Sequence, residues 1–220
     1  MNTAKKLIFE ELPLGYSPKT LPEIIRLAKN RNKQTAVVYR NAEGPVLFET
    51  DRLVIRRFSP DDGHAVWVLA NDKEASPLAG RDHPWPTDPE GCRDAAGYFA
   101  SEVTFWAVCL KPEFELIGMI VFNSVDEANR IDLGHVWRMP YMRDELDSEA
   151  IGLMIRYAFD HLQADGVYAY NPLDYEAQLH PLKQNGMKVV EVFENAVFPG
   201  SAEEVPGTFT GCKMMITRPK

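Results

Sequence analysis

Two side chains that could move a proton lie close together in one apolar stretch of the chain. Asp132 alternates with Ile131 and Leu133, so we expect it on the opposite face of a strand from these two. A carboxylate in a cleft is a candidate general base, and the alternative is an exposed acid that pairs with Arg130 or a lysine. His135 titrates near neutral pH and could deprotonate an amine, or it could be a hydrogen-bonded structural histidine.

An acidic run, residues 141–148, precedes the longest predicted helix. Its acids are Asp144, Glu145 and Asp147. Only Arg143 opposes them. Acids in the first turn of a helix stabilise its dipole by about 0.3–1 kcal/mol each, so Asp147 or Ser148 could serve as an N-cap alone. The same helix end could instead hold an anion through Arg143, Ser148 and backbone N–H groups, with the acids turned to solvent.

Composition and charge narrow the classes of partner. The chain of 220 residues has a net charge of -8 and a pI of about 5.2, so it should repel nucleic acid and anionic membrane surfaces. The three cysteines form no CxxC pair, and an odd number argues against a disulfide framework. We find no HExxH motif, no secretory leader and no apolar run of the roughly 20 residues that span a bilayer. A cytoplasmic protein without a bound metal is expected.

Strands and helices alternate in the predicted order of elements. Strands are expected at 53–58, 104–110, 116–122, 130–137, 167–170, 189–193 and 208–217. Helices are expected from 60 to about 71 and at 90–101, 146–163 and 173–184. Ser59 is the expected cap of the first helix, with Pro60 in its first turn. Short turns at 111–113 and 125–129 imply antiparallel pairing. The fold class is a mixed α/β sheet with helices on its faces.

The first 45 residues differ from the rest and are expected to form an N-terminal extension, 1–45, with a helix at 17–29 and a strand at 35–39. A turn at 41–45 separates the extension from the main domain, 46–220.

Several short strings in the main domain occur in a recognisable order. They are Glu49-Thr-Asp-Arg-Leu53, Ile55-Arg56, Ser59-Pro-Asp-Asp62, Glu115-Leu-Ile-Gly-Met119, Ile131-Asp-Leu-Gly-His135, Ser148-Glu-Ala150, Tyr157-Ala-Phe159 and Asn185-Gly-Met187. In this order and spacing, over roughly residues 47–215, they resemble the GNAT superfamily of bacterial acyl-CoA-dependent N-acetyltransferases. The subgroup they are most similar to acetylates ribosomal-protein N-termini and some antibiotics.

The resemblance implies a GNAT-like sheet, mostly antiparallel, and acetyl-CoA as co-substrate. The pantetheine arm would enter between the strands at 130–137 and 167–170. The residues implied to bind the cofactor are Val136, Trp137, Arg138, Arg143, Asp147 and Ser148. Asp132 aligns with the family's strand acid, the implied general base, and His135 lies in the same strand.

The acceptor implied by the resemblance is a primary amine, either of a small molecule or of a protein N-terminus. The loop at 81–86 lies where family members place acceptor-binding residues, so His83 and Trp85 could line that pocket, although the prolines beside them could serve only to stiffen the loop. Tyr175 could donate a proton to the leaving thiolate, the alternative being packing at the sheet edge. Whether the protein forms a homodimer is a question that the sequence leaves open.

Two departures from the family pattern keep a second hypothesis open. The glycines that the family places near Arg143 and Glu145 are absent, and Tyr175 and Gln178 stand where the family often has an asparagine and a small residue or serine. Like charges about 4 Å apart repel by roughly 4 kcal/mol at an effective dielectric of 20, so the acids could prevent binding of a diphosphate. The alternative function is therefore a catalytically silent GNAT-like domain that binds a ligand or partner.

Overall fold

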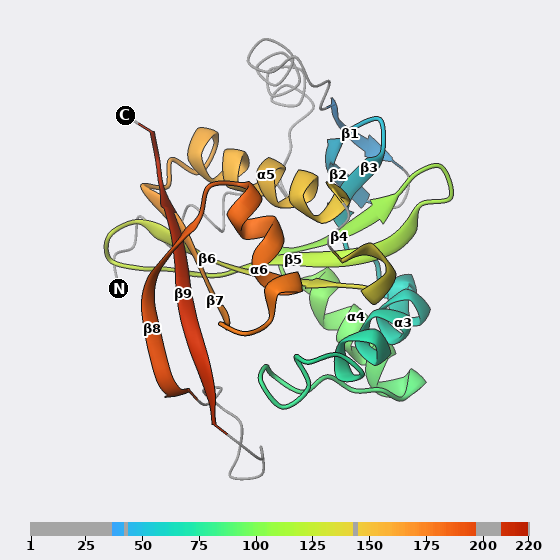
Figure 1. Cartoon of the computed structure of the whole chain (residues 1–220). Helices are drawn as coiled ribbons and strands as arrows, with labels where there is room; N and C mark the ends of the chain where they lie inside the picture. The colour runs from blue at the N-terminus through green and yellow to red at the C-terminus, as the bar shows by residue number, and fades with distance from the viewer. Residues whose placement is uncertain (1–36, 42–43, 143–144, 197–207, 220) are drawn as a thin grey trace.

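A computed structural model describes residues 37–41, 44–142, 145–196 and 208–219, and its strands form one nine-stranded sheet (Figure 1). The strands are β1 (Val37–Asn41), β2 (Gly44–Glu49), β3 (Leu53–Arg57), β4 (Phe105–Leu110), β5 (Glu115–Val125), β6 (Arg130–Trp137), β7 (Gly166–Pro172), β8 (Lys188–Ala196) and β9 (Phe209–Thr217). Their order in the sheet is β1-β2-β3-β4-β5-β6-β7-β9-β8. All neighbours pair antiparallel except β6 and β7, which are parallel. The predicted mixed sheet, with its antiparallel strands β4 to β6, is confirmed.

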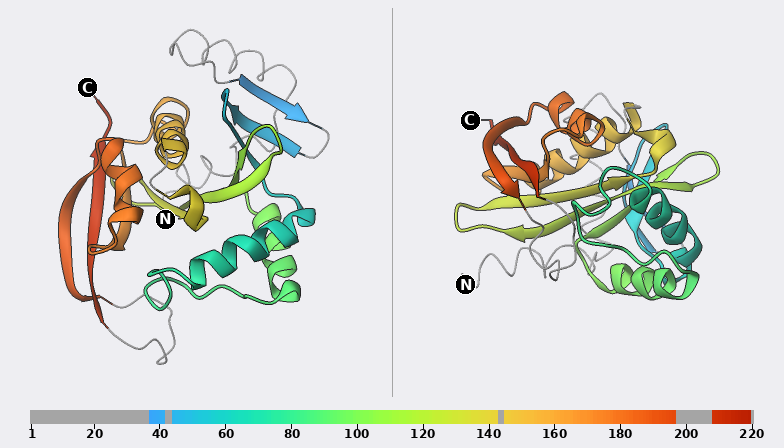
Figure 2. Two further views of the ribbon diagram at one scale, coloured as in Figure 1. Left: turned by 45° about the vertical axis from the view of Figure 1, so that its right-hand side comes forward. Right: turned by 60° about the horizontal axis from the view of Figure 1, so that its bottom comes forward.

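Helices cover both faces of this sheet. They are α3 (Gly63–Glu74), α4 (Pro89–Ser101), α5 (Glu145–Asp160) and α6 (Glu176–Gln184), with 3-10 turns η1 (Pro60–Asp62) and η2 (Met139–Tyr141). Figure 2 shows α5 on one side of the sheet and α3 and α4 on the other. The helix α6 packs beside α5 and against β7. No helix in the described part of the chain is long and apolar enough to cross a membrane.

The start of the first helical segment is fixed by local hydrogen bonds. The Ser59 hydroxyl accepts from the backbone N–H of Asp61, and the Asp62 carboxylate accepts from the backbone N–H of Ser59, which makes a capping box. Arg56 also donates two hydrogen bonds of 2.7 Å to Asp62. The predicted cap is therefore confirmed, and α3 runs to Glu74 rather than ending near residue 71.

Alternation along β6 divides its side chains between two cores. Ile131 and Leu133 belong to the core under α5 and α6, whereas Val136 belongs to the core under α3 and α4. Because side chains of a strand alternate between faces, Asp132 lies on the α3/α4 side. The predicted separation of Asp132 from its two apolar neighbours is what the structure shows.

The structure also differs from the predicted element boundaries. The strand β2 was not predicted, and it crosses the expected boundary between residues 45 and 46, so the division into two parts stays a prediction. The helix α5 ends at Asp160 instead of 163, and α6 begins at Glu176 instead of 173 with Pro181 in its interior. The predicted helix at 17–29 lies outside the described residues.

Candidate functional site

The strands β6 and β7 pair over a short stretch and then part. Their register pairs join Arg130 to Gly166, Ile131 to Val167, and Asp132 to Tyr168. Both strands continue, but β7 pairs with β9 along its whole length and β6 pairs only with β5 beyond this point. The β6 edge from Leu133 to Trp137 therefore presents backbone groups that lack a β7 partner.

The side chain of Gln178, from α6, reaches into the place where the strands part. Its Nε2 donates to the backbone carbonyl of His135 at 2.7 Å. The Trp137 Nε1–H donates to His135 Nδ1 at 2.8 Å, so the ring proton of a neutral histidine is assigned to Nε2. Among the described residues, neither His135 Nε2 nor Gln178 Oε1 has a hydrogen-bond partner, although both are buried. The parting strands thus contain buried polar atoms that a polar ligand could satisfy.

Burial keeps His135 neutral. The ring is 5% exposed, and this desolvation lowers its pKa from 6.5 to about 3. His135 lies three residues from Asp132 and hence on the opposite face of β6, toward α6. The structure does not bring these two candidate catalytic residues together.

Asp132 lies at the point of parting on the other face, and its carboxyl has a perturbed pKa. Burial raises this pKa from 3.8 to about 6, against the opposing effects of a hydrogen bond with Asn123 and the positive charge of Lys213. Arg130 pairs instead with Asp126, at 2.7 Å. A carboxylate with this pKa is half protonated near pH 6 and is a competent base at neutral pH.

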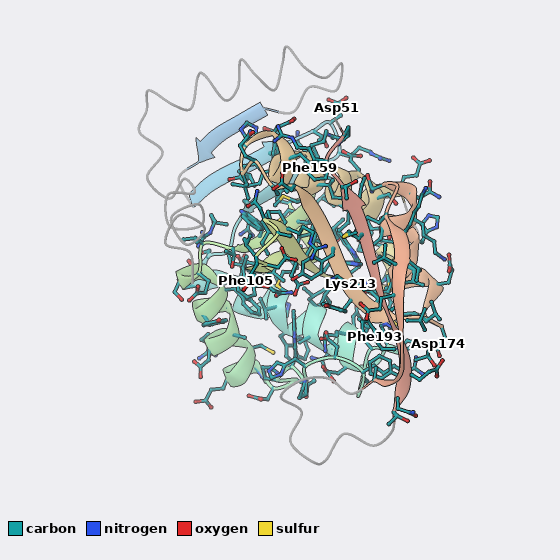
Figure 3. All side chains as sticks on the ribbon, turned by 90° about the vertical axis from the view of Figure 1, so that its left-hand side faces the viewer. Asp51, Phe105, Phe159, Asp174, Phe193 and Lys213 are labelled. Carbon is teal, nitrogen blue, oxygen red and sulfur yellow. The ribbon has the colours of Figure 1, made fainter. Side chains whose placement is uncertain are left out.

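A cation–aromatic cluster lies next to Asp132 on the same face. Lys213 Nζ lies 4.0 Å from the ring centroid of Tyr168 and 5.4 Å from that of Tyr170. The Tyr170 ring in turn lies 5.9 Å from that of Phe193 in β8. Figure 3 shows Lys213 at mid-length of the β8–β9 hairpin and Phe193 nearer its end.

Sequence reasoning missed this cluster. The tyrosines alternate in β7 and therefore share a face, but Lys213 joins them only because β9 inserts between β7 and β8. The alternation was readable from the sequence, and the register was not.

The loop that holds His83 and Trp85 is fixed by a buried lysine. Lys73 Nζ donates to Glu74 Oε1 at 2.8 Å and to the backbone carbonyl of His83 at 2.7 Å. The Trp85 ring packs 5.6 Å from the ring of Phe99, and the His83 side chain is exposed. Trp85 therefore contributes to the α3/α4 core periphery, while His83 faces solvent.

The same loop reaches the connection between β7 and α6. Arg81 Nη1 lies 2.6 Å from Asp174 Oδ1, a salt bridge between residues far apart in the sequence. This contact ties the proline-rich loop to the end of the strand that carries both tyrosines.

The acids at the start of α5 are arranged in two ways. The Glu145 side chain is 88% exposed and lies 3.7 Å from Arg52, and Glu149 accepts a 2.9 Å hydrogen bond from Arg52. Asp147 is fully buried and accepts from the Ser148 hydroxyl at 3.0 Å. Arg143 lies outside the described residues. The charge of Glu145 is thus turned to solvent and partly offset, whereas that of Asp147 is not exposed.

Val136 and Trp137 are the last residues of β6, and Arg138 follows them. The Val136 side chain is in the α3/α4 core and that of Trp137 packs over Gly118, so neither side chain is open to a ligand. Arg138 forms salt bridges with Asp72, at 3.2 Å, and Glu115. Any contact of the first two with a ligand would have to use their backbone.

Tyr175 stands at the N-cap position of α6, and its hydroxyl donates to Met142 Sδ at 3.3 Å. This places it on the α6 side, apart from the face that carries Asp132.

Cysteine and metal chemistry have little support in the described residues. Cys92, Cys109 and Cys212 are free and buried, and burial raises the pKa of Cys109 to about 11. Within residues 37–41, 44–142, 145–196 and 208–219, no cluster of histidine, cysteine and acidic side chains could hold a metal ion.

Comparison with known proteins identifies one domain family. Residues 52–188 match the family described as acetyltransferase (GNAT) domain. Comparison with curated proteins gives no match.

Solved structures share the fold at low sequence identity. A GNAT-family acetyltransferase from Bacillus anthracis has a TM-score of 0.66 at 20% identity, covering 77% of this chain and 96% of its own. A putative ribosomal-protein-serine acetyltransferase from Vibrio cholerae has a TM-score of 0.59 at 15% identity, covering 77% and 96%. Spermidine N-acetyltransferase from Vibrio cholerae, in complex with CoA and spermine, has a TM-score of 0.59 at 12% identity, covering 75% and 95%.

Proposed function

The chain belongs to the GNAT acetyltransferase family, and we propose that it transfers the acetyl group of acetyl-CoA to a primary amine of a small molecule or a protein N-terminus. One observation carries the proposal: Asp132, with its pKa near 6, lies where β6 and β7 part. A base at that position would serve an acyl donor held between the two strands.

The polar atoms between the strands fit the arm of such a donor. Pantetheine carries two amides, each with one N–H and one carbonyl. His135 Nε2 is a buried donor and Gln178 Oε1 a buried acceptor, and neither has a partner among the described residues. Together with backbone groups on the β6 edge that has no β7 partner, they supply the donors and acceptors that amides require.

The diphosphate would lie at the start of α5. Backbone N–H groups at a helix N-terminus suit an anion, and we propose that Arg143 adds a positive charge there. Ser148 could donate to the diphosphate only by giving up its hydrogen bond to Asp147. Arg52 offsets Glu145 and Glu149, which reduces the repulsion that the acidic run would otherwise exert. Asp147 would stabilise this end of the helix by accepting the hydrogen bond from Ser148.

In the proposed reaction, Asp132 removes the proton of the amine, directly or through one water, as nitrogen forms its bond to the acetyl carbon. Bound acetyl-CoA supplies the activated acetyl group and a thiolate leaving group. Tyr175 remains the candidate that protonates the leaving thiolate, from the α6 side. His135, being neutral and buried, would act by positioning and hydrogen bonding.

A second candidate function is a catalytically silent domain that binds a ligand or partner. It is favoured by one observation, the buried carboxylate of Asp147 in the first turn of the helix that would receive a diphosphate. If the domain is catalytically silent for this reason, it should not bind acetyl-CoA.

The proposed function is tested by comparing Asp132→Asn with Glu127→Gln. Glu127 is an exposed acid between β5 and β6, so its substitution makes the same change of charge away from the parting strands. We expect Asp132→Asn to lower the rate of thiol release from acetyl-CoA by about 10²-fold or more, without weakening acetyl-CoA binding measured by calorimetry. Equal rates for both variants and the unsubstituted protein would refute the role of Asp132.

A further inference from the structure

The ammonium group of Lys213 lies against two aromatic rings. It lies 4.0 Å from the Tyr168 ring centroid and 5.4 Å from that of Tyr170. Among the described residues the Lys213 ammonium forms no hydrogen bond or salt bridge, although Glu191 stands opposite this residue in β8. The rings hold the ammonium in place without neutralising it, which leaves its N–H groups available to an anion.

The strand register places this ammonium near Asp132. Tyr168 is the β7 partner of Asp132, and Tyr170 is the β7 partner of Lys213. Directly opposed side chains share a face of a sheet, so all four side chains lie on one face. The lysine leans past its own partner toward Tyr168, the residue level with Asp132, because its ammonium is nearer to that ring.

The face is therefore dipolar, with a carboxylate on β6, an ammonium over β7 and tyrosine rings between them. Tyr170 is 54% exposed, so its ring is accessible from solvent, whereas Tyr168 is 6% exposed and lies under the Lys213 ammonium. Cys212 and Met214, on either side of Lys213 in β9, point the other way into the α5/α6 core.

We propose that this face is the acceptor site and that it selects a primary amine that also carries an anionic group. The amine would lie at Asp132, the anion at Lys213, and the body of the molecule against the exposed Tyr170 ring. A carboxylate or a phosphate would satisfy Lys213 equally, so the predicted class is an amino acid or an aminoalkyl phosphate. The inference rests on the proposed acetyl transfer and narrows its acceptor.

A purely cationic acceptor fits this face less well. A polyamine would bring further positive charge beside Lys213 and would have to displace it from the rings. The two possibilities make opposite predictions for a variant that lacks the ammonium.

The test compares an amino acid with its decarboxylated amine, phenylalanine with phenethylamine, and adds phosphoethanolamine as the phosphate arm. We expect the unsubstituted protein to show a KM at least about tenfold lower for an anionic acceptor than for phenethylamine. Whichever of phenylalanine and phosphoethanolamine has the lower KM shows whether the site prefers a carboxylate or a phosphate. Lys213→Met should reduce that preference to within about threefold, and Lys213→Arg should retain most of it. Lys183→Met is the matched control, since Lys183 pairs with Glu176 on α6.

A second readout does not depend on turnover. N-acetylphenylalanine, or N-acetylphosphoethanolamine, should bind the unsubstituted protein in calorimetry and bind Lys213→Met at least about tenfold more weakly. Acetylation of all amines without preference would leave the proposed function standing and overturn this inference. A preference for phenethylamine that grows in Lys213→Met would overturn it too, and would identify Lys213 as the occupant of a cation site. Absence of both turnover and product binding would overturn both proposals.

Discussion

Asp132 and Tyr168 are the last pair of residues at which β6 and β7 share a register. The carboxylate and the phenol ring therefore lie side by side on the α3/α4 face, at the level where the two strands separate. On the opposite face, Gln178 enters the separation and binds the carbonyl of His135. The space that would receive an acyl donor is thus bordered by a candidate base on one face and by polar atoms on the other.

The pH dependence of transfer should follow Asp132. Because the carboxylate is the active form and burial places its pKa near 6, kcat is expected to fall about tenfold per pH unit below this value and to level off above it. The charge of Lys213 lowers this pKa, so Lys213→Met should move the inflection to higher pH. Rates of thiol release between pH 4.5 and 8 test both statements. An inflection that is unchanged in Lys213→Met would show that the two charges do not interact.

The same pKa predicts a stability effect. A carboxyl whose folded-state pKa is raised from 3.8 to about 6 binds more protons in the folded than in the unfolded state between these pH values. The free energy of unfolding should therefore fall as pH rises through this window. Above it, Asp132→Asn should be more stable than the unsubstituted protein by on the order of 1–3 kcal/mol, and near pH 4 the difference should be small. Urea unfolding at pH 4 and pH 8 measures this. A variant that is destabilised at pH 8 would contradict the burial of the charge.

Two glycines offer a matched test of packing beside the site. A Cβ on Gly118 would lie 2.2 Å from Trp137 Cε3, whereas a Cβ on Gly97, inside α4, meets nothing within 4 Å. Gly118→Ala should cost about 1–3 kcal/mol of unfolding free energy because the indole must move, and Gly97→Ala should gain about 0.5–1 kcal/mol from helix propensity. Thermal unfolding of both variants, with tryptophan fluorescence as a second signal, measures the difference. Equal stabilities would mean that the indole is not held where the structure places it.

Much of the local structure could be predicted from the sequence because it is encoded locally. The bounds of β6 were predicted residue for residue, since an apolar stretch with alternation is flanked by turns. Ser59 and Pro60 predicted a helix start because a cap and a first-turn proline depend only on neighbouring residues. The alternation around Asp132 likewise gave the face on which its side chain lies.

What the sequence could not provide are relationships between distant segments. Arg52 lies beside Glu145 and Glu149 although it is far from them in the chain. Because the sequence does not reveal this contact, it overstates how strongly the acids would repel a diphosphate. Lys213 meets Tyr168 only through the insertion of β9. The separation of His135 from Asp132, by contrast, could have been predicted from the sequence, because an odd spacing along a strand places two side chains on opposite faces.

The central claim is that this chain uses acetyl-CoA, and calorimetric titration of the protein with acetyl-CoA at low salt tests it most directly. The account predicts one molecule bound per chain with a dissociation constant in the micromolar range, equivalent to about 8 kcal/mol. No heat, and no shift in the unfolding temperature at millimolar acetyl-CoA, would contradict it and leave the fold with a binding role that does not involve an acyl donor.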